Sequence, residues 1–445
     1  MTKTNDQDML AIAQSCIAIA KSAGANDAAA RAYRVRDVSL DFRDGKVEKI
    51  SESTTRGVNL QLYVDGRYST VSTSDLRPDA LKTFISDTIA VARAITPDPF
   101  RALPDASLYK GQTDANLQLE DPKYFSITAD DGRKIAKIAH DAARTVKGAD
   151  AILSVTSSYS SNLVENWMVT SNGFSGTNRG TSFFVSAQVS AKDGDGRRPE
   201  EYDFAGSRFW GSVPDVANIG KSAAQRTLRR LGSKKGETSA MTVLVDNRAA
   251  GRLLGMLGQA LTAANLQQKR SFLEGKLGQE VLSPLVSITD DPLVTKGFGS
   301  RKFDNEGIAA KPRVVFENGV LKSYYIDSYY GRKLKMEPTS GSISNLSWKL
   351  GTKSQKELLA DAKEALLITS FIGGNSNSGT GDFSVGVVGF RVRNGEIAEP
   401  VAEMNLSGNH LEFWKKLVAL GNDPFAYSAM RPPTLVFENV SVAGT

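Results

Sequence analysis

Two tight-turn signals near the start of the chain, each between stretches of alternating residues, constrain the fold most strongly. Residues 38–42 alternate between apolar and polar side chains and lead into Asp44-Gly45. Residues 58–64 repeat the alternation and lead into Asp65-Gly66. Alternation places side chains on opposite faces of a strand, and Asp-Gly is a strong signal for a two-residue hairpin turn. The segment therefore predicts an antiparallel meander with one face toward solvent.

Other stretches show apolar residues at helical spacing instead. In one of them Leu81, Phe84, Ile85 and Ile89 recur on a single side of a helix. The stretches with this spacing are residues 8–23, 78–95, 131–146, 215–231 and 247–266. Strand runs that are joined by short turns and separated from the helices predict the α+β class, with antiparallel sheets and flanking helices.

Further strands and turns follow along the chain. Asn318-Gly319 and Asn394-Gly395 are typical of hairpin turns. The Gly, Ser and Asn residues of 373–381 predict a loop. Short apolar or alternating runs predict strands over residues 151–158, 164–170, 181–191, 202–204, 241–245, 383–392 and 434–437.

The length of the chain favours two domains. Domains usually contain ~100 to 200 residues, and this chain has 445. The polar stretch Gly232-Ser233-Lys234-Lys235-Gly236 follows the helix predicted over residues 215–231. We place the boundary there, which gives an N-terminal α+β domain over residues 1–231 and a C-terminal α+β domain over residues 237–445.

Composition and charge are those of an ordinary soluble protein. Hydrophobic residues make up 40% and charged residues 23%, and the net charge of +6 permits only weak attraction to polyanions. The apolar stretch 9–20 follows Asp6 and Asp8 instead of the basic start of a secretion signal, and no segment approaches the ~20 apolar residues of a membrane span. Cys16 has no partner thiol, which suits a reducing compartment. We expect a cytoplasmic protein without a membrane anchor.

Histidine is scarce, and this limits the chemistry. The chain contains only His140 and His410, whereas metal and hydrolytic sites often need two or three histidines. His140 is interpreted as a partly exposed helix residue. His410 follows Asn409, a typical N-cap residue, and is the better placed of the two to contact a ligand. Without a His-Glu-x-x-His pair or a Cys-x-x-Cys motif, the sequence predicts no catalytic residue and no metal ligand of its own.

Three other motifs have simpler explanations than catalysis. Asp290-Asp291-Pro292 and Asp304-Asn305-Glu306-Gly307 consist of turn-forming residues. The glycine-rich loop 373–381 lacks the Gly-Lys-Ser/Thr ending of a phosphate-binding loop and precedes a strand, so we expect it to border a cleft. The basic residues of 226–235 have no interleaved aromatic residues and are interpreted as a solvated helix end, which does not favour a nucleic-acid partner.

Several phrases in consistent order resemble the TldD/PmbA family, once called modulators of DNA gyrase and now regarded as a two-subunit metallopeptidase system. The likeness covers nearly the whole chain. The phrases are Arg56-Gly57-Val58, Asp98-Pro99-Phe100, Asn172-Gly173-Phe174, residues 271–278 (Ser-Phe-Leu-Glu-Gly-Lys-Leu-Gly), Asp290-Asp291-Pro292, residues 303–307 (Phe-Asp-Asn-Glu-Gly) and residues 440–444 (Val-Ser-Val-Ala-Gly).

The resemblance also implies a division of labour between subunits. The catalytic subunit, TldD, carries a His-Glu-x-x-x-His motif on a helix before the Gly-Lys-Leu-Gly-like segment and a zinc-binding cysteine near its C-terminus. The matching helix here, residues 247–261, contains neither His nor Glu, and residues 427–431 contain no cysteine. The chain therefore resembles the TldE (PmbA) branch, a subunit that lacks the zinc ligands and the general base and is inactive alone. Zinc is expected in a TldD-like partner.

In this picture the two subunits enclose a cavity that holds an unfolded or modified peptide in extended form. The alternatives are a homodimeric peptide-binding module without peptidase activity and a modulator that associates with DNA or gyrase. The residues expected to line the peptide cavity in this chain are Ser271, Phe272, Lys276, Gly379, Gly381, Asp382, Phe383 and His410.

Overall fold

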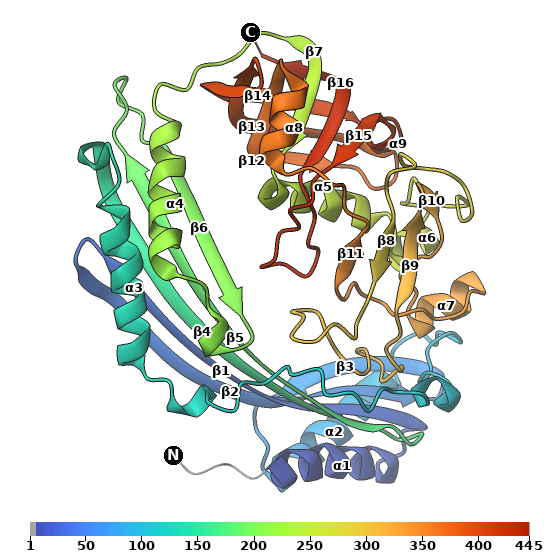
Figure 1. Ribbon diagram of the computed structural model, residues 1–445. Helices are drawn as coiled ribbons and strands as arrows, with labels where there is room; N and C mark the ends of the chain where they lie inside the picture. The colour runs from blue at the N-terminus through green and yellow to red at the C-terminus, as the bar shows by residue number, and fades with distance from the viewer. Residues whose placement is uncertain (1–5, 445) are drawn as a thin grey trace.

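The computed structural model describes residues 6–444, so the first five residues and the last residue of the predicted domain ranges lie outside it. A long sheet built from the N-terminal half curves beside the C-terminal half (Figure 1). The predicted α+β fold with antiparallel sheets and flanking helices is confirmed. No helix among residues 6–444 is long and apolar enough to cross a membrane.

The N-terminal sheet is a six-stranded antiparallel meander in the order β3-β2-β1-β4-β5-β6. Its strands are β1 (Asp27–Arg43), β2 (Lys46–Val64), β3 (Arg67–Thr73), β4 (Ile152–Thr170), β5 (Ser175–Ala191) and β6 (Glu200–Ser207). The two predicted Asp-Gly turns join its first three strands, and Asp44, Gly45, Asp65 and Gly66 all have positive φ angles. That backbone conformation is the one a two-residue hairpin requires.

Four helices cover one face of this sheet: α1 (Asp6–Ser22), α2 (Pro78–Ala92), α3 (Ala129–Ala143) and α4 (Val216–Arg229). Residues at even positions of β1 point to this face along its whole length. Ala28, Ala30 and Ala32 pack with α1 and α2, and Val38 and Leu40 pack with α3 and α4. The opposite face is therefore free to contact the C-terminal half.

The C-terminal half contains a six-stranded sheet in the order β14-β13-β12-β7-β16-β15, and an extra pairing of β14 with β16 closes five strands into a small barrel. Its elements are β7 (Ser239–Val245), β12 (Ala365–Ser376), β13 (Asp382–Arg393), β14 (Glu396–Asn409), β15 (Leu417–Leu420) and β16 (Leu435–Ala443), with α5 (Asn247–Gln259), α8 (Gln355–Ala362) and α9 (His410–Phe413). Helix α5 follows β7 directly, because Asp246 caps it by accepting a hydrogen bond from Arg248 N–H.

A smaller four-stranded sheet, β10-β9-β8-β11, lies beside the barrel. It contains β8 (Ile288–Asp290), β9 (Arg313–Glu317), β10 (Val320–Leu321) and β11 (Leu346–Trp348), with helices α6 (Ala263–Gln267) and α7 (Ser328–Leu334) nearby in the chain. The short 3-10 helices are η1 (Ala106–Tyr109), η2 (Tyr124–Ser126), η3 (Ala149–Ala151), η4 (Trp210–Ser212) and η5 (Trp414–Lys416).

Contacts between the halves use the helix-free face of the N-terminal sheet. Phe184 of β5 stacks on Phe298, with ring centroids 5.3 Å apart. Arg31 of β1 donates to the side-chain oxygen of Asn305 at 3.0 Å and to its carbonyl at 2.7 Å. Arg332 of α7 donates to the backbone carbonyls of Phe100, Ala102 and Leu103. The segment between α2 and α3 is thus held against the C-terminal half.

Several predicted elements differ from the observed ones. The strands predicted over 151–158 and 164–170 are one continuous strand, β4, because Ser160 and Asn162 occupy its outward positions and do not interrupt it. The helix predicted over 247–266 breaks after α5, and Thr262 starts α6 by accepting from Asn265 N–H. The loop predicted over 373–381 is strand as far as Ser376.

Candidate functional site

His410 lies at the centre of a group of residues from three distant parts of the sequence. Its imidazole stacks on Phe383 of β13, with ring centroids 4.7 Å apart, and on Phe272, with centroids 5.5 Å apart. Its backbone N–H donates to the carbonyl of Gly381 at 2.8 Å. The imidazole is fully buried. Stacking between flat rings therefore fixes the end of β14 against the β12–β13 hairpin.

Burial sets the charge state of this histidine. Desolvation lowers the pKa of His410 to about 4, so the imidazole is neutral at pH 7. Its Nε2 atom lies 3.0 Å from the Ser376 hydroxyl, and its Nδ1 atom has no hydrogen-bond partner among residues 6–444. The Ser376 and His410 pair has no carboxylate behind it, so His410 acts here as a packing residue that positions Ser376.

The turn between β12 and β13 is fixed from both sides. The Asn409 side-chain amide donates to the Thr380 carbonyl at 2.9 Å and to Asp382 Oδ1 at 3.0 Å. On the other side, Phe272 N–H donates to the Ser378 carbonyl at 2.8 Å. Gly381 has a φ of +87°, and a Cβ at this position would lie 3.2 Å from both Asn409 and Phe272. Only glycine fits this turn without strain.

Two cavities open on either side of the β12 end. The first, which we call the α5 cavity, has a volume of about 610 Å³ and is lined by Arg252, Gly255, Met256, Gln259, Asn265, Gly374, Asn375, Ser376 and Ser378. The second, the hairpin cavity, has a volume of about 500 Å³ and is lined by Asn375, Ser376, Asn377, Ser378, Asp382, Phe383 and Ser384. Both volumes lie in the range of small-ligand sites. Asn375, Ser376 and Ser378 face both cavities.

The wall that α5 contributes to its cavity has little chemical reactivity. Arg252 donates from Nη2 to the Gly373 carbonyl at 2.7 Å, which ties the helix to β12. Gly255, one turn later, leaves open space, since a Cβ there would meet nothing within 4 Å. Met256 and Gln259 complete the wall. None of these four side chains is an ordinary zinc ligand or a general base at neutral pH.

The structure brings most of the predicted cavity residues together. Asp382 and Phe383 line the hairpin cavity. Ser271, Phe272, Gly381 and His410 lie behind it as buried support, and Gly379 N–H donates to Asn377 Oδ1 at 2.9 Å. Lys276 lies further along its turn, and its side chain forms no hydrogen bond or ion pair with this group in the described part of the chain.

Sequence reasoning missed the α5 wall as a cavity surface, whereas residues 375–378 belong to the loop that was expected to border a cleft. The α5 wall consists of residues without characteristic chemistry, so only their position on the exposed face of an amphipathic helix could have revealed them.

His140 was wrongly interpreted as partly exposed. It is 6% exposed and packs edge-on against Phe42. Asp290 is fully buried and accepts a hydrogen bond from Ser344 N–H at 2.9 Å.

No group of three or more His, Cys, Asp or Glu residues within 6–444 could hold a metal ion. The residues present therefore do not fit the zinc that the resemblance places in the catalytic subunit. Two basic residues at the end of α4 are neutralised, because Arg230 pairs with Glu201 at 3.0 Å and Arg226 approaches it at 3.9 Å. Arg229, Lys234 and Lys235 are exposed, as a solvated helix end predicts, whereas Arg226 and Arg230 are partly buried.

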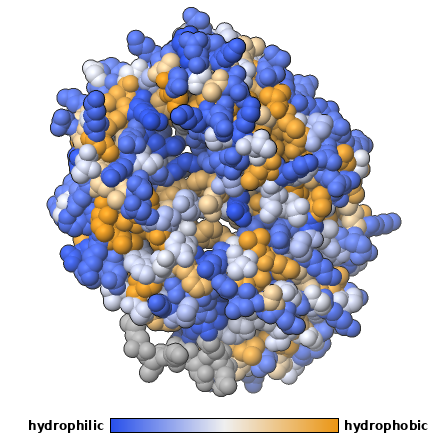
Figure 2. Space-filling model, viewed as in Figure 1, coloured by the Kyte–Doolittle hydropathy of each residue, from blue (hydrophilic) through white to orange (hydrophobic). Residues whose placement is uncertain are grey.

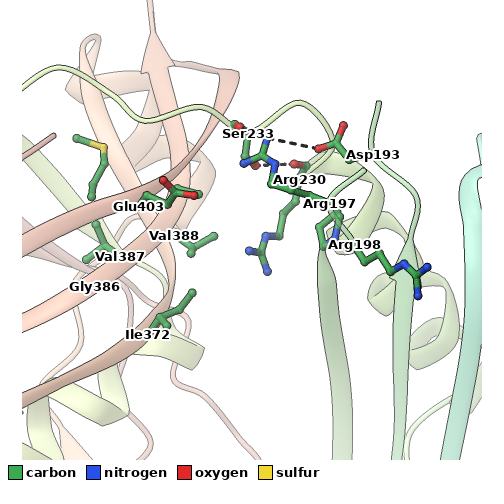
Figure 3. A pocket seen from close by; sticks show the side chains of 13 residues that line it. Asp193, Arg197, Arg198, Arg230, Ser233, Ile372, Gly386, Val387, Val388 and Glu403 are labelled. Carbon is green, nitrogen blue, oxygen red and sulfur yellow. Dashed lines mark hydrogen bonds and ion pairs between the residues drawn. The ribbon is translucent and has the colours of Figure 1, made fainter. Parts of the chain in front are cut away.

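A further cavity, the boundary cavity, lies between the halves and has a volume of about 360 Å³. Figure 3 shows Arg197, Arg198 and Arg230 on one side of it and Ile372 and Val388 on the barrel side. Arg197 is already engaged, since it donates to the Ser233 carbonyl at 2.5 Å and approaches Asp193 at 3.6 Å. The molecular face in Figure 2 is mostly hydrophilic and is hollowed near its centre, where the halves meet.

The chain thus combines a curved meander, covered by helices on one face, with a small barrel that has a cavity against its first helix. Three family models match the chain: PmbA/TldA metallopeptidase domain 1 over residues 28–94, the central domain over residues 122–231 and the C-terminal domain over residues 238–444. The chain belongs to the PmbA/TldD metallopeptidase family.

Individual relatives agree with this assignment. The metalloprotease PmbA of Escherichia coli O157:H7 is 28% identical over 438 residues, which cover 96% of this chain and 94% of that protein. A crystal structure of a candidate modulator of DNA gyrase from Bacteroides thetaiotaomicron is 37% identical, with a TM-score of 0.95 and full coverage of both chains. TldE from Thermococcus kodakarensis shares the fold, with a TM-score of 0.84 at 18% identity over 97% of this chain and 100% of that one.

Proposed function

We propose that this chain is the non-catalytic, TldE-type subunit of a two-subunit zinc metallopeptidase and that it shapes the cavity in which an unfolded or modified peptide lies. One observation carries the proposal. The face of α5 that borders the α5 cavity presents Arg252, Gly255, Met256 and Gln259, at the helix where the resembling catalytic subunit places two histidines and a glutamate. A metallopeptidase needs three zinc ligands and a base for its water.

In this proposal zinc belongs to a TldD-like partner. This chain contributes walls and hydrogen-bonding groups. Asn375, Asn377 and Ser378 expose amide and hydroxyl groups at the end of β12, and such groups can pair with the main chain of an extended peptide. Main-chain pairing gives affinity with little dependence on side chains, which suits a complex that accepts unfolded peptides of varied sequence.

The test compares the chain alone with the chain mixed with a TldD-like partner. We expect the lone chain to carry no stoichiometric zinc and to leave a fluorogenic peptide uncut. The mixture should form a stable heterodimer with one zinc per pair and should cut the peptide. Stoichiometric zinc together with cleavage by the lone chain would overturn the proposal. Self-association with peptide binding, and no complex with the partner, would instead support a homodimeric binding module.

A second experiment tests the α5 cavity itself. A Cβ on Gly255 would meet nothing within 4 Å, so Gly255→Phe directs a ring into the α5 cavity. We expect the heterodimer to form normally and peptide cleavage to fall at least tenfold. Gly251→Phe is the matched control, because it lies one turn earlier on α5, also faces open space and does not line the cavity. Equal cleavage by both variants would exclude this cavity from peptide binding.

A further inference from the structure

A separate cavity of about 310 Å³ lies where β2 and β3 meet loops of the C-terminal half, and we call it the tyrosine cavity. It is lined by Gln61, Tyr63, Tyr68, Arg101, Ala102, Asp304, Asn305, Glu306, Asp327, Tyr329, Tyr330, Gly341 and Ser342. Both halves contribute side chains, and none of them belongs to the α5 cavity or the hairpin cavity. Any ligand in this cavity would contact both halves at once.

One cation in the tyrosine cavity is held in place without a hydrogen-bonding partner. The guanidinium of Arg101 lies 3.4 Å from the ring centroid of Tyr329 and 4.4 Å from that of Tyr68. It forms no hydrogen bond and no ion pair with residues 6–444. Contact with two aromatic rings restricts the guanidinium plane while its N–H groups stay available. A carboxylate fits such a group, because it can accept two N–H bonds side by side.

One anion in the tyrosine cavity is also incompletely satisfied. Asp304 is 5% exposed. Its Oδ1 atom accepts from the N–H groups of Glu306 and Ile308 at 2.8 and 3.0 Å, whereas Oδ2 has no hydrogen-bond partner in the described chain. Burial raises the pKa of Asp304 despite these bonds. An ammonium group beside Oδ2 would supply the missing donor.

Three other polar side chains of the cavity, Glu306, Asp327 and Tyr329, make hydrogen bonds within the chain. Both carboxylate oxygens of Glu306 accept from Ser328, through its N–H and its hydroxyl. Asp327 Oδ1 accepts from Tyr330 N–H at 2.7 Å, and the Tyr329 hydroxyl donates to Asp98 at 2.7 Å. A metal ion is not favoured, since no three carboxylate or imidazole groups within 6–444 cluster suitably. The cavity thus offers the Arg101 guanidinium as a donor for a carboxylate and the buried Asp304 Oδ2 as an unpaired acceptor for an ammonium group.

We propose that the tyrosine cavity binds a small zwitterion of the α-amino acid class, a free amino acid or a dipeptide, with its carboxylate on Arg101 and its ammonium group on Asp304. The volume of about 310 Å³ is at the lower limit of small-ligand sites, which excludes longer peptides. This site does not depend on zinc, on a partner subunit or on the proposed peptidase role. The ligand would bridge the two halves and stabilise their contact.

The test is calorimetric titration of the full chain with alanylalanine, N-acetyl-alanylalanine and alanylalanine amide. We expect one site for alanylalanine and at least tenfold weaker binding of each capped form. Arg101→Gln should bind the dipeptide and its amide equally, because the carboxylate has lost its partner. Asp304→Asn should likewise bind the dipeptide and its acetylated form equally. Arg198→Gln, an arginine of the boundary cavity, is the matched control and should bind like the parent chain.

The crossed pattern separates a binding role from general damage to the fold. A merely destabilised variant would bind all three ligands more weakly and by the same factor. Loss of a specific contact would instead remove the preference for one free end group. If Asp304→Asn does not fold, titration of Arg101→Gln with alanylalanine and alanylalanine amide still tests whether Arg101 binds the carboxylate. No heat with millimolar alanylalanine, or equal binding of all three ligands by the parent chain, would overturn the proposal.

Discussion

The hydroxyl of Ser376 lies 3.0 Å from Nε2 of His410. A residue that faces both the α5 cavity and the hairpin cavity is thereby linked to a histidine without solvent contact. Because the imidazole is neutral and stacked between two phenylalanine rings, the geometry of the cavity wall depends on a group that must stay uncharged.

The first prediction follows from that requirement. The pKa of His410 is about 4 in the folded chain, below its ordinary value of 6.5. A depressed histidine pKa gives stability that is present above pH 6.5 and is lost as the pH falls toward 4, because only the unfolded chain takes up the proton. Lowering the pH from 7 to 5 should therefore cost about 2 kcal/mol at this residue.

Urea unfolding at both pH values would measure the effect. His410→Gln should show a smaller loss of stability at pH 5 than the parent chain, by about 2 kcal/mol. Ser376→Ala should keep the full pH dependence, since burial and not the hydrogen bond lowers the pKa. An unchanged pH dependence in His410→Gln would show that this histidine is not the responsible group.

The second prediction concerns Glu306, which should lower the stability of the chain as the pH rises, the reverse of the effect of His410. Burial raises the pKa of this carboxyl to about 7, above its ordinary value of 4.5. A raised carboxyl pKa gives stability that is lost as the pH rises from 4.5 through 7, since the folded chain resists losing the proton. Between pH 5 and pH 8 the free energy of unfolding should therefore change less in Glu306→Gln than in the parent chain, by about 2 kcal/mol. Urea unfolding with Glu337→Gln, an exposed glutamate of the same half, provides the control.

The third prediction concerns a buried ion pair in the N-terminal sheet. Glu165 is 1% exposed, accepts from Arg34 Nε at 2.5 Å and lies 3.0 Å from Arg179. Glu165→Gln removes the charge between two arginines and should destabilise the chain by about 3 to 5 kcal/mol. Glu120→Gln, which alters a more exposed contact of Arg179, should cost less than about 1 kcal/mol. Equal losses of unfolding free energy in the two variants, measured by urea unfolding, would contradict the prediction.

The fourth prediction compares two helix glycines. A Cβ on Gly220 of α4 would lie 1.8 Å from the carbonyl oxygen of Ala139 on α3, whereas a Cβ on Gly251 of α5 would meet nothing within 4 Å. Gly220→Ala should therefore separate α3 from α4 and lower the thermal unfolding midpoint by several degrees. Gly251→Ala should raise stability by about 0.5 to 1 kcal/mol through helix propensity. Stabilisation by both substitutions would refute the close approach.

The turns of the fold could be predicted because their chemistry is local. Asp44-Gly45 and Asp65-Gly66 carry the turn signal within two residues. The length of β4 could not be predicted in the same way. Ser160, Ser161 and Asn162 suggest a break when taken alone, but pairing with β1 and β5 continues through them. Neighbouring strands supply that pairing, and a local window does not contain it.

The candidate sites also differ in how far a local sequence pattern could reveal them. Part of the group around His410 could be anticipated, because the contiguous phrase at residues 271–278 resembles the family and the loop 373–381 was expected to border a cleft. The tyrosine cavity could not, because Tyr63, Arg101, Asp304 and Tyr329 come from four separate parts of the sequence. Asp304 and Glu306 do form a turn, with Gly307 N–H donating to the Asp304 carbonyl at 3.2 Å. The same turn presents a buried carboxylate to a cavity, which turn chemistry alone does not reveal.

The contact of Arg332 with the segment between α2 and α3 has an evolutionary consequence. Its three acceptors are the carbonyl oxygens of residues 100, 102 and 103, which every amino acid possesses. Side chains in that segment can therefore drift among homologues without breaking the contact, provided that the backbone path is kept. The arginine has no such freedom, because a fork of N–H donors is needed to reach three carbonyls at once.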